Sequence, residues 1–385
     1  DSRRSYHETV DEFSSVLHRV VDEQSAGGRL AVPISGGLDS RTTVAALTRD
    51  GAPSGASLWS FSYGYAPDSV ETAIAGQIAG ARSLPFEALT IGPYLFDRLG
   101  SVLGAVEGFQ DVTQSRQATV TDRLAGRADA VVAAHWGDVW HDDMGLADRP
   151  GAAPAEVLEH ALSKIAKRGR HWLLDELVAP HVGEPPESIV RDEVAEELDR
   201  VPALSDADFR LKAFKTEQWS FRWTLASIRM HQAGAFPRLP FYDTRMSDFF
   251  ATVPTEFVRG RRLQIDYLKR CAPDLARIRW QAYDTNLYRF RYFDSLLLPS
   301  RALKKAKRLW KRAPAVERNW EVQFFGETGR RRLEDALQSA RLGELVPRPR
   351  VRSLLDAFYA SPLAEGRGYT VSMLLTLSSW LEAYG

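Results

Sequence analysis

The stretch AVPISGGLDSRTTVAAL, residues 31–47, carries most of the information about the fold. An apolar run at residues 30–34 leads into two adjacent glycines, and small or apolar residues suited to a helix follow at 42–47. A strand, a glycine-rich loop and a helix in this order begin a nucleotide-binding α/β unit. Pro33 has no N–H to donate, so we expect irregular pairing near the end of this strand.

The same alternation continues through the first part of the chain. We expect further strands at residues 57–62, 84–91 and 130–134, and helices at 10–21, 69–81, 94–106 and 115–124. The continuous apolar run AVVAA at 130–134 is typical of a parallel strand that is covered on both faces. The sequence therefore predicts an α/β fold with a parallel, doubly wound sheet and right-handed crossovers.

Loop-forming residues at 148–154 (DRPGAAP) predict a boundary between two lobes. We expect a nucleotide-binding α/β lobe at 1–149 and a mainly helical substrate lobe at 150–385 that completes the cleft. The clearest helices of the second lobe are expected at 157–165, 189–198, 206–230, 263–271 and 369–384. The basic run RALKKAKRLWKR, residues 301–312, favours a solvated helix face.

Composition narrows the class of protein. The 385 residues carry 50 basic and 50 acidic side chains, and this balance argues against a protein that mainly wraps nucleic acid. No run of eighteen apolar residues exists, which excludes an ordinary transmembrane helix, and we expect a cytoplasmic protein without a membrane partner. The single cysteine, Cys271, rules out an intrachain disulfide framework and is expected to be a small buried residue.

The glycine loop has the composition of a pyrophosphate-binding loop. Gly36 and Gly37 allow backbone amides to approach an anion, and the hydroxyls of Ser35 and Ser40 are available to phosphate oxygens. A helix that starts near Ser40 directs its N-terminal amides at the same anion. Asp39 would repel phosphates unless a cation lay between them, so its presence indicates Mg²⁺. The loop is not a Walker loop, because no lysine completes it.

This stretch resembles the SGGxDS signature of the ATP pyrophosphatase (PP-loop) superfamily, whose fold is HUP-like. Leu38 makes it most similar to the asparagine-synthetase branch, which β-lactam synthetases and lasso-peptide cyclases share. The resemblance covers roughly residues 8–285. It implies that ATP is bound by Ser35, Gly36, Gly37, Leu38, Asp39, Ser40, Ser62 and Gly64.

A second acidic motif follows the apolar run at 130–134. Gly137 and Asp138 resemble the family's GEGADE segment, which implies that Asp138 acts with Asp39 as a catalytic residue and magnesium ligand. Val139 stands where the family usually has glutamate, so Asp142 or Asp143 remains an alternative ligand.

Histidines and tryptophans surround this acidic motif. His135 and His141, together with the nearby carboxylates, leave zinc open as an alternative to magnesium. Trp136 and Trp140 are expected to be packing residues.

The segment RLPFYD at 238–243, followed by VPTEF at 253–257, resembles the family's RVPFLD…LP.E segment. This implies that Arg238 and Asp243 belong to the substrate lobe. Arg222 and Arg229, seven residues apart on one helix face, either bind an acidic substrate or pair with surface carboxylates.

One departure concerns the catalytic cation. The family places a lysine shortly after this segment, whereas residues 278–286 (IRWQAYDTN) contain none. Arg279 is one replacement, and Lys304, Lys305 or Lys307 is another.

The resemblance implies a carbon–nitrogen ligase that uses ATP and Mg²⁺. A small-molecule or peptide carboxylate would be adenylated with release of pyrophosphate, and ammonia or an amine would then displace AMP. The family's N-terminal glutaminase domain has no counterpart in the sequence, so a separate domain or partner, or a free amine, would supply nitrogen. The alternatives are another PP-loop enzyme, of the thiolating or NAD-forming type, and a non-catalytic nucleotide-binding homologue.

Overall fold

The computed structural model describes residues 4–51, 55–165, 169–201, 204–293, 319–362 and 366–385. The basic run at 301–312, with Lys304, Lys305 and Lys307, lies outside the described residues. Within the described ranges we find no helix that combines the length and apolar character needed to span a lipid bilayer.

The chain forms two compact units, and each is assembled from three separate segments. The first unit takes Asp1–Gly92, Thr119–Asp143 and His231–Arg318, and the second takes Pro93–Ala118, Met144–Met230 and Asn319–Gly385. Residues 93–118, expected in the first lobe, belong to the second unit. The chain leaves the first unit again after Asp143, near the boundary expected at 149–150, and returns to it at His231.

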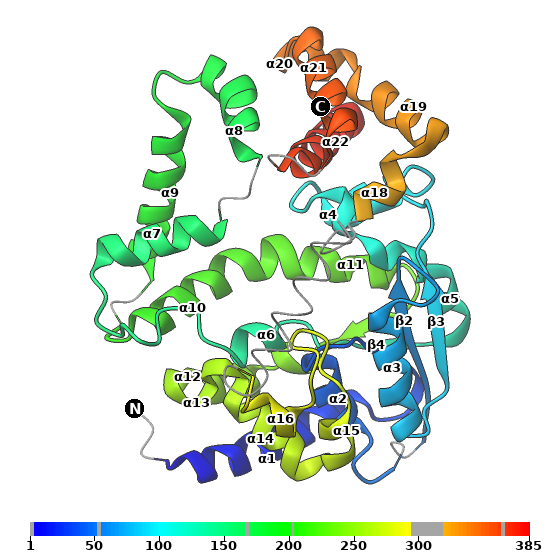
Figure 1. The fold of residues 1–385 in the computed structure, drawn as a ribbon, viewed down its shortest axis with the longest axis vertical. Helices are drawn as coiled ribbons and strands as arrows, with labels where there is room; N and C mark the ends of the chain where they lie inside the picture. Colours follow the sequence, from blue (N-terminus) through cyan, green and yellow to red (C-terminus); the bar gives the residue numbers. More distant parts are fainter. Residues whose placement is uncertain (1–3, 52–54, 166–168, 202–203, 294–318, 363–365) are drawn as a thin grey trace. The chain divides into compact units, whose positions relative to one another are not determined.

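A five-stranded sheet forms the centre of the first unit (Figure 1). Its strands are β1 (Gly28–Pro33), β2 (Ala56–Gly64), β3 (Phe86–Thr90), β4 (Ala130–Val132) and β5 (Phe236–Arg238). All neighbouring strands are parallel and their order is β3-β2-β1-β4-β5, which confirms the predicted α/β fold and parallel sheet. The order reverses at β1, and in such sheets ligands bind outside the carboxyl ends of the strands where the order reverses.

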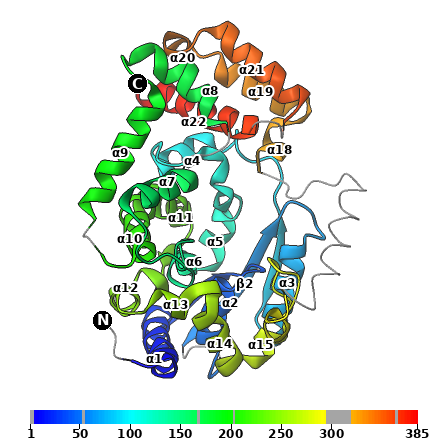
Figure 2. The same cartoon turned by 60° about the vertical axis from the view of Figure 1, so that its left-hand side comes forward.

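Helices surround this sheet and line its edges. Those of the first unit are α1 (Tyr6–Gln24), α2 (Asp39–Leu47), α3 (Val70–Ala81), α5 (Thr121–Arg127), α6 (Gly137–Trp140), η6 (Pro240–Tyr242), α12 (Thr244–Ala251), α13 (Thr255–Val258), η7 (Arg259–Arg261), α14 (Arg262–Cys271), α15 (Pro273–Arg277) and α16 (Leu287–Phe290). α1 runs beside α12 and α14 (Figures 1 and 2). Its predicted apolar face is buried, as the complete burial of Phe13 and Leu17 shows.

Side chains of successive strand residues point to opposite faces of the sheet, and both faces are buried. Leu30 and Val132 belong to one apolar cluster, whereas Ala31, Phe61 and Val131 belong to another that includes residues of α5. Burial on both faces explains why the central strands are continuous apolar runs rather than alternating ones.

Pro33 ends β1, and its position explains how the strand tolerates it. The pairing with β2 continues to Pro33, and the Ile34 amide donates to the Phe61 carbonyl oxygen at 2.8 Å. The pairing with β4 stops at Ala31. Alternate amides point to alternate neighbours, so the N–H that Pro33 lacks would have pointed towards β4. The irregular pairing that we expected is therefore confined to that side.

The strand β5 was not predicted, because the sequence analysis treated residues beyond 150 as mainly helical. It has three residues, one of them Pro237, and it pairs with β4 alone at the edge of the sheet. Proline is tolerated in edge strands because one side of the strand needs no ladder donor. A run this short shows no alternation that reveals it in the sequence.

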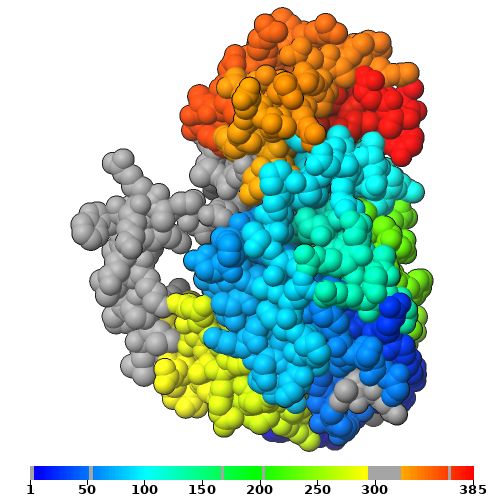
Figure 3. All heavy atoms as spheres, turned by 90° about the vertical axis from the view of Figure 1, so that its right-hand side faces the viewer, coloured from blue at the N-terminus to red at the C-terminus, as the bar shows by residue number. Residues whose placement is uncertain are grey.

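The second unit is helical in the described residues. Its helices are α4 (Leu99–Val106), η1 (Val112–Gln114), η2 (Arg116–Thr119, ending in the first unit), α7 (Pro154–Ile165), α8 (Arg170–Leu173), η3 (Leu174–Val178), η4 (Ala179–His181), α9 (Pro186–Arg200), α10 (Ala207–Trp219), η5 (Ser220–Leu225), α11 (Ala226–Gln232, entering the first unit), α18 (Asn319–Phe324), α19 (Gly326–Leu337), α20 (Ala340–Leu345), α21 (Arg348–Ala360) and α22 (Arg367–Tyr384). Figure 3 shows the atoms of the C-terminal helices, in orange and red, gathered together. The segments α10, η5 and α11 follow one another without a break, and η5 is a π-helical segment.

Candidate functional site

The glycine loop lies between β1 and α2, at the carboxyl end of the central strand. Ser40 Oγ accepts a hydrogen bond from the Ser35 amide at 3.0 Å, and the two serine hydroxyls are 3.0 Å apart. The Gly37 amide donates to Ser35 Oγ at 3.2 Å. Both hydroxyls therefore bond within the loop, which curls around them.

Asp39 is the first residue of α2, and its carboxylate meets residues of α14 and the turn before it. Asp39 Oδ1 accepts from Arg261 Nη1 at 2.8 Å and from Gln264 Nε2 at 2.9 Å. The Gln264 amide group also donates to Thr42 Oγ1 at 3.1 Å. The carboxylate is thus fixed against a guanidinium and an amide, neither of which the sequence analysis had selected.

The second acidic motif lies directly against Asp39. A Cβ atom placed on Gly137 would stand 3.0 Å from the Cβ, Cγ and Oδ1 atoms of Asp39. Asp138, the next residue, is exposed and close enough to act electrostatically on Asp39. The structure therefore brings together the two carboxylates that the sequence analysis paired, although they are almost a hundred residues apart.

The charge state of Asp39 reflects this environment. Burial raises the pKa of Asp39, the Arg261 guanidinium opposes that rise, and the Asp138 carboxylate adds to it. Two neighbouring carboxylates at the carboxyl ends of adjacent strands favour a cation between them. In this structure Arg261 supplies the positive charge to Asp39.

Arg261 also lies close to a third carboxylate. Its Nε is 3.6 Å from Asp142 Oδ2, while Asp142 Oδ1 accepts from the amides of Gly260 and Asp143 at 3.0 Å each. Gly260 and Arg261 both have left-handed backbone conformations, with φ values of 62° and 63°. A left-handed arginine is uncommon, and such residues concentrate where the backbone presents a functional side chain.

The backbone is unusual on the other side of Asp39 as well. Trp136, which precedes Gly137, has φ 77°, a value that large side chains seldom adopt. The ring of Trp136 packs on Tyr242 with centroids 5.6 Å apart. Trp140 stacks on Phe250 at 5.4 Å, and its Nε1 donates to the Phe241 carbonyl at 2.8 Å. Both tryptophans are packing residues, as expected.

The described residues do not support the zinc alternative. Within those ranges no group of three or more histidine, cysteine or acidic side chains lies close enough together to hold a metal ion. His141 is fully buried among aromatic rings, and its Nδ1 donates to the Gly137 carbonyl at 2.8 Å. Magnesium needs fewer protein ligands, because it keeps waters and uses one or two carboxylates together with phosphate oxygens.

A pair of histidines lies near this motif. His231 is fully buried, and burial together with neighbouring His135 lowers the pKa of His231 to about 3. The His231 ring is therefore neutral at physiological pH, and sequence analysis had not selected it.

The stretch at 278–286 lies against the glycine loop. The backbone N–H of Gln281 donates to the Gly36 carbonyl at 3.2 Å. A Cβ atom placed on Gly36 would stand 2.3 Å from the side-chain oxygen of Gln281. Arg279 instead pairs with Asp284 at 2.8 Å. The side chain that reaches the loop is therefore a neutral amide, where the family resemblance had led us to look for a cation.

Arg41 connects α2 to this stretch and was also missed. Its guanidinium donates to the carbonyls of Leu275, Ile278 and Arg279 at 3.2, 2.9 and 2.8 Å. The side chain is fully buried, and burial lowers the pKa of Arg41 to about 10. In the sequence, the one indication of this role is that Arg41 is charged while its neighbours in the predicted helix are small or apolar.

Ser62 and Gly64 lie at the carboxyl end of β2. Ser62 is buried, and Gly64 is so close to Ser69 that a Cβ on the glycine would stand 2.1 Å from Ser69 Oγ. Ser69 caps α3 by accepting from the Thr72 amide. This packing requires a glycine at 64 whether or not a nucleotide binds, so ATP contact at Ser62 and Gly64 stays a prediction.

Arg238 and Asp243 belong to the first unit and contact its other elements. Arg238 Nη1 donates to the Gln24 carbonyl at 2.6 Å, which ties β5 to the end of α1. Asp243 caps α12 and pairs with Arg245 at 2.8 Å, and Arg245 also contacts Glu23. These contacts hold the segment in place, and a substrate role for either residue stays a prediction.

The remaining candidates have defined surroundings. Arg229 pairs with Glu107 at 2.5 Å, in line with the surface-carboxylate alternative, while Arg222 donates to Gln218. Cys271 is half-buried on α14 with Sγ 3.7 Å from Ser14 Oγ on α1.

Comparison with known proteins adds no family assignment. No protein-family model matches the chain, and no curated protein matches it with significance. The functional argument therefore depends on the residues of this chain and on their arrangement.

Proposed function

We propose that the chain is an ATP-dependent ligase that joins a carboxylate to ammonia or an amine, of the PP-loop, asparagine-synthetase-like type. A carboxylate oxygen of the substrate attacks the α-phosphorus of ATP, and the bond to the β-phosphate breaks with release of pyrophosphate. The amine nitrogen then attacks the acyl-adenylate, loses a proton and displaces AMP. Cleavage between the α and β phosphates distinguishes this reaction from one that yields ADP.

One observation carries the proposal: Asp39 of the SGGLDS loop packs against Gly137 of the second acidic motif where the strand order reverses. The loop follows β1 and the motif follows β4, and these two strands are neighbours in the sheet. A loop rich in glycine and serine at the start of a helix is suited to an anion. Two carboxylates beside it are suited to the metal that accompanies nucleotide phosphates.

The residues present fit a magnesium ion. Asp39 and Asp138 would hold it, and when bound it would neutralise phosphate charge and orient the pyrophosphate. Burial raises the pKa of Asp39, and a bound cation would oppose that rise because it favours the ionised carboxylate. The loop of Ser35 to Ser40 would hold the pyrophosphate through its amides and hydroxyls.

Among the residues that the structure describes, Arg261 is the cation best placed to assist. It already contacts Asp39, and its side chain is 17% exposed, so it can reach a ligand at the loop. A guanidinium beside the phosphates would stabilise negative charge that develops in the transition state. Arg261 therefore takes the role for which Arg279 and the lysines at 304, 305 and 307 were considered.

A second candidate is a nucleotide-binding protein without turnover. It is favoured by Gln281, the neutral side chain that lies over Gly36, and by the pairing of Arg279 with Asp284. In that case the loop would bind ATP and no carboxylate would be activated.

ATP–pyrophosphate exchange with Mg²⁺ and a panel of carboxylic acids tests the proposal. We expect one class of acid to support exchange, and Asp39→Asn to abolish it because the carboxylate that serves the metal is lost. Asp192→Asn makes the same change on an exposed helix of the second unit and should leave exchange intact.

The products and the binding of ATP separate the candidates. Formation of ADP and phosphate instead of AMP and pyrophosphate would reject adenylation. ATP binding that is lost in Asp39→Asn, without exchange for any acid, would favour the non-catalytic protein.

A further inference from the structure

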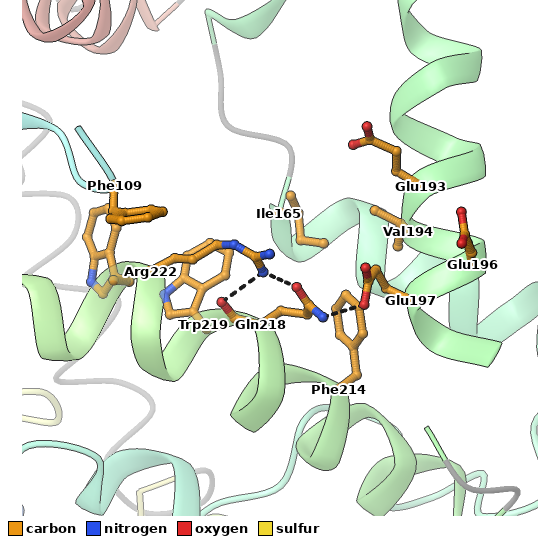
Figure 4. A pocket seen from close by; sticks show the side chains of 11 residues that line it. Phe109, Ile165, Glu193, Val194, Glu196, Glu197, Phe214, Gln218, Trp219 and Arg222 are labelled. Atoms are coloured by element: carbon orange, nitrogen blue, oxygen red, sulfur yellow. Dashed lines mark hydrogen bonds between the residues drawn. The ribbon is translucent and has the colours of Figure 1, made fainter. Parts of the chain in front are cut away.

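A cavity of about 580 Å³ lies in the second unit between α9 and the continuous helix formed by α10 and η5 (Figure 4). Its size falls within the range of pockets that hold small organic ligands. Nothing in the ATP reaction proposed above uses this cavity, and the inference that follows does not depend on that reaction.

Aromatic side chains form one wall of the cavity. Trp219 and Trp223 lie one helical turn apart with ring centroids at 5.9 Å and planes inclined by 38°. Phe109, which is 58% exposed, lies beside these rings, and buried Phe214 lines the cavity near Glu197 (Figure 4). Such a wall offers ring faces both to an apolar body and to a positive charge.

The backbone of this wall is unusual. The segment Ser220–Leu225, which begins directly after Trp219 and contains Trp223, is π-helical rather than α-helical. π-Helical segments are rare and are frequently found at functional sites, because the wider turn redirects side chains. Here the segment carries both Arg222 and Trp223 to the cavity.

Carboxylates form the opposite wall. Glu193, Glu196 and Glu197 of α9 line the cavity, and among the lining residues that the structure describes the cation is Arg222. The Arg222 guanidinium donates to Gln218, and the Gln218 amide nitrogen donates to Glu197 Oε2 at 2.6 Å, so this part of the wall is internally bonded (Figure 4).

Glu193 differs from the other two glutamates. Arg200 pairs with Glu196 at 2.5 Å and with Glu197 at 2.7 Å. Glu193 is exposed and makes no hydrogen bond or ion pair with any residue that the structure describes. Its carboxylate extends from α9 towards the side on which Trp219 and Arg222 lie (Figure 4). Among the described residues, an unpaired carboxylate therefore faces the aromatic wall.

We propose that this cavity binds a small organic cation, an amine carried on an apolar or aromatic body. The ammonium group pairs with Glu193, and the body lies along Phe109, Trp219 and Trp223. An anion is disfavoured by the unpaired carboxylate of Glu193, and a neutral compound of the same shape lacks the ion pair and the cation–π contact.

Isothermal titration calorimetry with three compounds of similar shape tests the charge requirement. At pH 7 and low salt, 2-phenylethylamine should bind about fivefold or more tightly than 2-phenylethanol, because a partly exposed ion pair contributes on this scale. 3-Phenylpropanoate should bind most weakly. Added salt should weaken the binding of the amine and leave the binding of the alcohol unchanged.

Two variants assign the contacts. Glu193→Gln should reduce the affinity for the amine about fivefold and leave the affinity for the alcohol unchanged. Trp223→Ala should weaken both compounds about tenfold, since it removes ring area as well as the cation–π contact. Glu184→Gln, the same change at an exposed glutamate that does not line the cavity, is the control and should have no effect.

Circular dichroism and thermal unfolding would establish that each variant is folded. Failure of the amine to bind the wild-type protein at millimolar concentration overturns the proposal. Equal affinity for the three compounds, or equal losses in Glu193→Gln and Glu184→Gln, overturns it as well.

Discussion

At the level of single residues, the candidate site depends on the contact between the Asp39 carboxylate and the Arg261 guanidinium. Asp39 could be selected from the sequence, since an acidic residue in an anion-binding loop needs a cation. Arg261 could not, because one arginine among 50 basic residues has no distinguishing sequence context. Its left-handed backbone and its contacts with Asp39 and Asp142 set it apart only in the folded chain.

Arg261→Gln should destabilise the protein, because the partly buried Asp39 carboxylate loses its positive partner. The expected loss in free energy of unfolding is about 1–3 kcal/mol. In an Asp39→Asn background the same substitution should cost about 1 kcal/mol or less, because no carboxylate remains to be compensated. Urea denaturation of the four proteins of this double-mutant cycle measures the coupling. A coupling near zero would mean that the two side chains do not interact in solution.

His231 should make stability depend on pH. Its pKa is lowered to about 3 in the folded chain, so between that value and the ordinary histidine pKa of about 6.5 the unfolded chain binds one more proton. The stabilising contribution is therefore complete above pH 6.5 and is lost progressively as the pH falls. His231→Gln should remove this dependence, and it should shrink the loss in unfolding free energy between pH 7 and pH 5 by about 2 kcal/mol.

Urea denaturation at pH 7, 6 and 5 measures this difference. His7→Gln, a change at an exposed histidine of the same unit, is the control and should follow the wild-type protein. If His231→Gln lost as much stability on acidification as the wild type, the His231 ring would be protonated in the folded chain.

At the level of elements, close packing of α6 against the start of α2 sets the position of the Asp39 carboxylate. Gly137, the first residue of α6, lies so near Asp39 that a methyl group must displace one of the two segments by a few tenths of an ångström. The sequence predicted the glycine loop and the apolar strand before Gly137. The family resemblance paired Asp39 with Asp138, but the close packing of Gly137 on Asp39 was not predicted, because packing between segments a hundred residues apart leaves no local pattern.

Gly137→Ala should weaken the binding of ATP with Mg²⁺ about tenfold, since small displacements of a positioned group are costly. The fold should remain intact, with a loss in unfolding free energy of about 1 kcal/mol. Calorimetric titration with nucleotide and urea denaturation measure the two effects. Gly126→Ala is the control, because open space surrounds Gly126 in α5. If both variants bound the nucleotide with equal affinity, the packing of Gly137 would have no part in nucleotide binding.

At the level of the whole molecule, the two compact units do not follow the order of the chain. The sequence analysis placed one boundary at 149–150 from loop-forming residues, and such a boundary describes a chain that passes from one lobe to the next once. The contacts instead return the segment that begins at His231 and ends before Asn319 to the first unit, where it supplies β5, Arg261 and Gln281. Composition reports local loops, whereas membership of a unit depends on contacts made after the chain has folded.

The sequence by itself determined the α/β class, the parallel sheet and the glycine loop with Asp39, because hydrophobic periodicity and backbone freedom are properties of neighbouring residues. It also paired Asp39 with Asp138 through a resemblance of motifs. Only the tertiary structure decided that Arg261 and Gln264 hold Asp39, that Gln281 lies over Gly36, and that an acidic and aromatic cavity forms in the second unit. Those features depend on which distant segments pack together. Many contacts throughout the folded chain determine that packing, so no single stretch of sequence reveals it.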